Sequence, residues 1–227
     1  MKKVLLAAAA AALFAASPAA AAGVKGIVVA RSSSALAIAA PTGVVHMVRV
    51  HSAARVGSVV SVSGSRVAIV GLAHRVRFRG IVVRNVGSTS FLAAGGMLLT
   101  VHARGRHVAA VGDTGPTAGT VVNTTATVGA NGTLTQQSSQ TVGQAGNVSV
   151  QATVTSVGAG TVTITVNGQP LTLPLPSGLT LPTTIVGSTV TLSLNLGGGT
   201  ATATAEQDDQ DEQGDDNDDQ DEADDSD

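Results

Sequence analysis

A short glycine-led phrase, present at residues 56–63 and again at residues 186–193, constrains the fold more than any other feature. In each copy a Val-Gly-Ser sequence leads into a run in which apolar residues alternate with serine or threonine. Successive side chains of a strand point to opposite faces, so this alternation predicts a β-strand with one buried and one solvated face. Its recurrence predicts a duplicated β unit.

Other segments repeat in the same way. Residues 26–29 and 80–83 both read Gly-Ile-Val-Val, and a basic residue, Lys25 or Arg79, precedes each copy. Residues 161–166 alternate valine or isoleucine with threonine, which is typical of a half-buried strand.

Two Asn-Gly pairs, at residues 131–132 and 167–168, predict two-residue β-hairpin turns. Residues 171–181 carry Pro174 and Pro176 and follow Pro170 directly. Proline has no amide donor for a strand ladder, so this stretch is expected to be an edge strand or a loop.

The sequence therefore predicts an all-β chain, built either from tandem small OB-like barrels or as a β-sandwich. The 27 glycines among 227 residues fit a strand-and-turn architecture. We expect a signal peptide at 1–22, β-barrel units at 23–72, 73–145 and 146–196, and a glycine linker with a disordered acidic tail at 197–227. Units of about 50 residues are marginal alone, so they are expected to pack together.

The first residues predict secretion. Lys2 and Lys3 precede an apolar run at 4–16, and three alanines at 20–22 suit a signal peptidase. The run is shorter than the roughly 20 residues that a spanning helix needs. We expect cleavage after Ala22, a secreted or extracytoplasmic chain, and no transmembrane segment in the mature protein. The absence of cysteine excludes disulfides and a lipid-modified cysteine.

Charge is sorted along the chain. Of 15 acidic residues, 14 lie in residues 206–227, whereas 11 of 13 basic residues lie in residues 25–106. This sorting predicts a solvated acidic tail that cannot bury enough apolar surface to fold. The tail could solubilise the chain, fold back over the basic segment, or condense cations weakly on Asp208, Asp209, Asp211, Asp215, Asp216, Asp218 and Asp219.

The strand and glycine order resembles secreted bacterial tandem domains with an OB-like barrel, a family of unknown function. The resemblance covers residues 24–196 and is carried by Gly26 with Gly57, by Gly80 with Gly112 or Gly119, and by Gly187. In the third unit Ala152 or Thr153 stands in place of the early glycine. The resemblance implies an extracytoplasmic β-barrel module and no particular reaction.

The residues argue against catalysis. The predicted folded body contains a single acid, Asp113, so it has no carboxylate pair, and no Gly-x-Ser-x-Gly elbow supports a triad. The five histidines lack close ligand spacing and sit in a basic stretch. We expect no enzyme, no cofactor and no specific metal site.

A basic strand face is the candidate ligand site. Arg75, Arg77 and Arg79 stand at i, i+2 and i+4, so a strand here carries its cations on one face, while Val76 and Phe78 face the core. Nucleic acid is not expected, because single-strand binders need exposed aromatic platforms and Phe78 and Phe91 are better explained as core. The candidate ligand-binding residues are Arg75, Arg77, Arg79, Arg84, Arg104 and Arg106.

Two functions fit these features. The first is a secreted, non-enzymatic β-barrel repeat protein that serves as a structural or binding module of the cell envelope or exterior. The alternative is a binder of acidic polymers, such as teichoic acids or acidic polysaccharides, through the basic face, with the protein's own acidic tail as a competitor.

Overall fold

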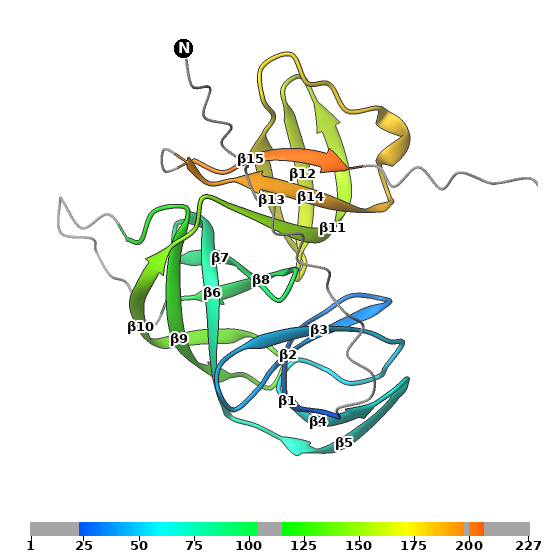
Figure 1. Cartoon of the computed structure of the whole chain (residues 1–227), viewed down its shortest axis with the longest axis vertical. Coiled ribbons are helices and arrows are strands. Elements are labelled where there is room, and N and C mark those ends of the chain that lie inside the picture. Colours follow the sequence, from blue (N-terminus) through cyan, green and yellow to red (C-terminus); the bar gives the residue numbers. More distant parts are fainter. Residues whose placement is uncertain (1–22, 104–114, 198–199, 207–227) are drawn as a thin grey trace, which may run out of the picture.

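The computed structural model describes residues 23–103, 115–197 and 200–206. The predicted signal peptide, Asp113 and the acidic residues beyond Glu206 lie outside the described residues. Across the described part the chain forms fifteen β-strands and one short 3-10 turn, which confirms the predicted all-β class. Strand pairing follows the same order in three successive sets of five strands, stacked along the long axis of the molecule (Figure 1).

The first strand set contains β1 (Val24–Arg31), β2 (Ala35–Ala39), β3 (Val45–Arg49), β4 (Ser58–Ser63) and β5 (Arg66–Leu72). Its strands lie in the order β3-β2-β1-β4-β5, with antiparallel pairing throughout. The first copy of the repeated phrase supplies β4.

The second strand set contains β6 (Arg75–Val86), β7 (Thr89–Ala94), β8 (Met97–His102), β9 (Thr120–Val128) and β10 (Leu134–Gln144). The order β8-β7-β6-β9-β10 matches the first set, and here a parallel pairing between β8 and β10 joins the two ends. The result is a closed, five-stranded OB-like barrel.

The third strand set contains β11 (Asn147–Gly158), β12 (Thr161–Val166), β13 (Gln169–Pro174), β14 (Thr189–Asn195) and β15 (Thr202–Glu206). Its order is again β13-β12-β11-β14-β15, and the second copy of the repeated phrase supplies β14. The turn η1 (Thr183–Ile185) precedes β14. The proline-containing strand β13 lies at the end of the order, as predicted for an edge strand.

The strand β15 corrects the predicted linker. Residues 197–205 were expected to be a flexible connection, yet Thr202–Glu206 pairs with β14. Ala201 and Ala203 are buried in the third set's core, whereas Thr204 is exposed. Alanine contributes little hydrophobicity, so the alternation of alanine and threonine in this segment does not by itself predict a strand. The strand forms because β14 offers an edge with which it can pair. The third set therefore runs past the predicted boundary at residue 196.

The two predicted hairpin turns differ in outcome. Asn167 and Gly168 form a two-residue turn between β12 and β13, with φ of 50° and 78°, as type I′ turns require. The other Asn-Gly pair lies in a five-residue connection at residues 129–133, so the two-residue turn expected there is wrong. Asn131 instead accepts a 2.8 Å hydrogen bond from the Thr133 hydroxyl, which stabilises a longer turn.

The first and second sets pack against each other through β2, every residue of which is buried. Leu36 and Ile38 point into the first set's own core. Ala35, Ala37 and Ala39 point the other way, into a core shared with the second set. Alternation of large and small apolar residues lets a single strand serve two cores, because alanine permits the second barrel to approach closely.

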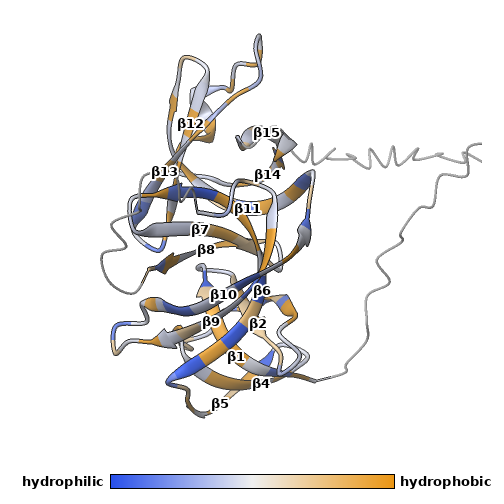
Figure 2. Cartoon of the chain, turned by 90° about the vertical axis from the view of Figure 1, so that its left-hand side faces the viewer, coloured by the Kyte–Doolittle hydropathy of each residue, from blue (hydrophilic) through white to orange (hydrophobic). Residues whose placement is uncertain are grey.

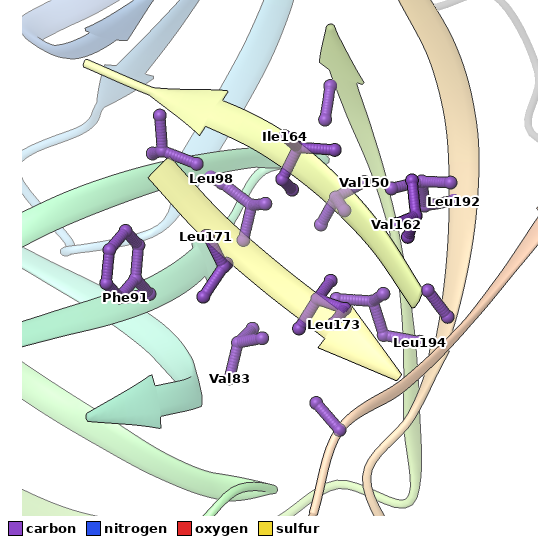
Figure 3. Close-up of a cluster of buried hydrophobic side chains, with 14 of the residues drawn as sticks. Val83, Phe91, Leu98, Val150, Val162, Ile164, Leu171, Leu173, Leu192 and Leu194 are labelled. Atoms are coloured by element: carbon purple, nitrogen blue, oxygen red, sulfur yellow. The ribbon is translucent and has the colours of Figure 1, made fainter. Parts of the chain in front are cut away.

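The second and third sets share a further core (Figure 3). Phe91 and Leu98 of the second set meet the inward row of the third, which includes Ile164 and Leu171. The backbone amide of Gln151 donates to the carbonyl of Gly96 at 2.8 Å, so β8 and β11 meet as parallel strands and join the two sets in one sheet. No helix in the described ranges is long and apolar enough to cross a membrane.

Candidate functional site

The strand β6 places three arginines on one face. Arg75, Arg77 and Arg79 are exposed, and Val76 and Phe78 between them are buried, as the alternation predicts. Figure 2 shows hydrophilic and hydrophobic residues alternating along β6. Successive arginines are separated by two residues of strand, or roughly 7 Å along the chain. We call these three residues the arginine row.

Two neighbouring strands extend the arginine row into a polar sheet face. Each arginine has a cross-strand partner on β9 and, beyond it, one on β10. Directly paired residues point to the same face of a sheet. The partners that share the face of the arginines are Thr127 and Thr135 beside Arg75, Thr125 and Ser138 beside Arg77, and Asn123 and Gln140 beside Arg79.

The polar face combines cations with neutral hydrogen-bonding groups. Arg79 Nε donates a 3.3 Å hydrogen bond to Asn123 Oδ1, which holds that guanidinium against β9. Among the side chains that the structure describes, none is acidic, so no carboxylate there neutralises the arginine row. The face can therefore attract an anion and also hydrogen-bond the hydroxyl groups of a ligand.

Arg84 does not join the arginine row. A β-bulge between Val82 and Arg84 interrupts the alternation of β6. Beyond the bulge, Arg84 Nη1 donates a hydrogen bond to the carbonyl oxygen of Thr172 on β13. This arginine thus bridges the second and third sets and lies apart from the arginine row. Arg104 and Arg106 lie outside the described residues.

A cleft next to the arginine row could not be predicted from the sequence. It has a volume of about 420 Å³ and lies where the first and second sets meet, lined by Lys25 and Arg77 together with mainly apolar residues. The sequence gives no sign of this juxtaposition, because Lys25 and Arg77 belong to different strand sets and approach only when the sets pack.

The described histidines form no metal-binding cluster. No group of three or more histidine, cysteine, aspartate or glutamate side chains lies there in an arrangement able to hold a metal ion. His51 Nδ1 lies 2.8 Å from the carbonyl oxygen of Ser33, and His102 Nδ1 lies 3.1 Å from the hydroxyl of Thr89. Both contacts stabilise local turns and strand pairs.

No family model and no curated protein matches the chain. Among solved structures, one match is the chain described as drosophila Unr CSD456, a cold-shock-domain protein with an OB-fold. The identity is 12%, the match covers 82% of this chain and 96% of that one, and the TM-score is 0.22.

Proposed function

We propose that the protein is a secreted, non-enzymatic β-barrel module of the cell envelope or exterior. In this proposal it binds acidic polymers, such as teichoic acids or acidic polysaccharides, through the polar face of β6, β9 and β10. The observation that carries the proposal is the arginine row, exposed beside rows of hydroxyl and amide side chains.

A polymer with regularly spaced anions and hydroxyl groups matches both parts of this face. The cations contact phosphate or carboxylate groups, and the threonine, serine and amide side chains hydrogen-bond the polyol or sugar. The buried positions of Phe78 and Phe91 favour such a ligand over single-stranded nucleic acid, because neither ring is exposed for base stacking.

The acidic tail is the proposed internal competitor. It follows β15 directly and carries 13 acidic residues after Glu206. A dense anionic segment in the same molecule has a high effective concentration at the arginine row, so it lowers the apparent affinity for an external polyanion. Weak cation condensation on the tail would oppose this competition by screening its charge.

The test titrates dextran sulfate, as a model polyanion, onto residues 23–227 and residues 23–206 across a salt series. The second protein ends at Glu206 because a cut at residue 205 would shorten β15. Polymer binding through the arginine row predicts tighter binding without the tail and an affinity that falls steeply with salt. No binding by either protein at low salt would exclude the polymer-binding function and leave the structural module.

A matched pair of triple variants tests whether the arginine row is the polymer-binding site. Arg75→Gln, Arg77→Gln and Arg79→Gln together should reduce the slope of log affinity against log salt by about one per arginine. The control replaces Arg31, Arg49 and Arg66 with glutamine. These arginines are exposed on three different strands, and replacing them removes the same amount of charge. Equal losses in the two triple variants would show that net charge, and not this face, determines binding.

A further inference from the structure

One wall of the cleft between the first and second strand sets is an apolar floor, formed by side chains that strand pairing places side by side. Ile27 on β1 pairs with Ala39 on β2 at one side and with Val59 on β4 at the other. These three side chains therefore form a row across three adjacent strands, and all three line the cleft. Its volume of about 420 Å³ falls within the roughly 300–1,000 Å³ range of small-molecule sites.

Two cationic side chains, from different strand sets, line the cleft beside this apolar floor. Lys25 lies two residues before Ile27 on β1, so both side chains share one face of the strand. Arg77 comes from β6 of the second set and lines the same cleft. Within the described part of the chain, neither side chain faces a carboxylate. The cleft thus combines apolar contact area with a positive charge that lacks a partner.

The walls of the cleft are fixed by the backbone. The amide of Arg79 donates to the carbonyl oxygen of Gly43 at 2.7 Å, which ties β6 to the turn between β2 and β3. Gly26 brings β1 and β2 close together, because a Cβ there would lie 2.2 Å from the carbonyl oxygen of Ala39. A preformed cleft loses little conformational entropy when a ligand binds.

We propose that this cleft binds a small amphiphilic anion, namely a phosphate or carboxylate group joined to a short hydrocarbon chain. The anionic group lies between Lys25 and Arg77, and the hydrocarbon lies on Ile27, Ala39 and Val59. Such a ligand could be a free molecule or the end of a lipid, because both present the same chemistry. The inference goes beyond polymer binding, since it needs only one member of the arginine row.

The primary test adds hexyl phosphate to the full-length protein labelled with 15N and follows the amide signals of β1, β2 and β4 by NMR. Butyl and pentyl phosphate complete a series in which each added methylene should tighten binding by up to about fourfold. Inorganic phosphate supplies the charge alone and should bind far more weakly. An affinity that does not rise with chain length would overturn the proposal.

Two variants separate this cleft from the polymer-binding face. Lys25→Gln should weaken hexyl phosphate binding about threefold. Val59→Thr keeps the side-chain shape and should weaken it about fourfold. The control, Arg66→Gln on β5, removes one positive charge at a residue that does not line the cleft. It should leave hexyl phosphate binding unchanged. If Lys25→Gln and Val59→Thr both bind like the unmodified protein, the cleft is not the site.

A vesicle assay distinguishes the two sources of ligand. Vesicles of phosphatidylglycerol in phosphatidylcholine are compared with phosphatidylcholine alone, again with Lys25→Gln and Val59→Thr. Loss of anionic-vesicle binding in both variants would indicate a lipid end group, whereas an effect confined to soluble hexyl phosphate would indicate a free ligand. Dextran sulfate binding that survives Val59→Thr would show that the cleft and the polymer-binding face act separately.

Discussion

The backbone amide of Gly57 donates a 2.8 Å hydrogen bond to the carbonyl oxygen of Val28. Val28 directly precedes the register shift in β1, so the bond joins the start of β4 to a bulge in its neighbour. The other two strand sets repeat this arrangement at 2.8 Å, with Gly119 bonded to Val82 and Gly187 bonded to Val154. In each set, the glycine before the fourth strand therefore bonds that strand to the bulge in the first strand.

Gly57→Ala should destabilise the protein more than Gly187→Ala. Both glycines have φ near +90°, so alanine is strained by about 1–3 kcal/mol at either position. At Gly57 the new Cβ would also lie 2.6 Å from Cγ1 of Val128, whereas at Gly187 it meets nothing within 4 Å. Urea unfolding of the two variants measures the difference. Equal losses would mean that Val128 moves aside without cost.

Gly26→Ala should be more damaging than Gly80→Ala, although the two positions are equivalent in the first two sets. A Cβ at Gly26 would lie 2.2 Å from a backbone oxygen, whereas one at Gly80 would lie 3.3 Å from Cβ of Leu92. Overpacking against backbone typically costs about 1–3 kcal/mol. Thermal unfolding by circular dichroism tests the ranking, and a Gly80→Ala loss as large as that of Gly26→Ala would contradict it.

Thr124→Val should stabilise the protein. Thr124 is 1% exposed, and its hydroxyl has no hydrogen-bond partner among the described residues. Removing an unsatisfied buried hydroxyl while keeping the side-chain shape should add about 1 kcal/mol to the free energy of unfolding. For a chain of this size that corresponds to a rise in Tm of about 2–4 °C by calorimetry.

Thr127→Val on the same strand is the control for Thr124→Val. The hydroxyl of Thr127 donates to the carbonyl oxygen of Thr135 at 3.3 Å and accepts from Nε2 of Gln137 at 3.2 Å. Its loss should lower the free energy of unfolding by about 0.5–1.5 kcal/mol. A lower Tm for both variants would show that Thr124 is bonded in solution.

Truncation should reveal where the folded chain ends. Ending the chain after Glu206 should leave its stability unchanged, because β15 stays paired with β14. Ending it after Leu196 removes β15 together with the buried residues Ala201 and Ala203, so the third set should unfold at a lower temperature. Hydrogen exchange of the β14 amides measures this directly. Equal protection in both truncated chains would mean that β15 contributes no stability.

The sequence by itself determined the local structure. Alternation along β6 was sufficient to place Arg75, Arg77 and Arg79 on one face, because neighbouring residues of a strand must point to opposite sides. The glycine phrases fixed where β4 and β14 begin, since φ near +90° is accessible to glycine at little cost. These features depend on near neighbours in the chain.

Tertiary structure alone decided the rest. Arg84 donates to the carbonyl oxygen of Thr172, and Lys25 and Arg77 line one cleft, because strand sets distant in sequence pack together. The alanines that permit this packing, like Ala203 in β15, carry too little hydrophobicity to indicate what they will contact. A strand's own pattern shows which face is buried, whereas the partner against that face is set by contacts between residues far apart in the chain.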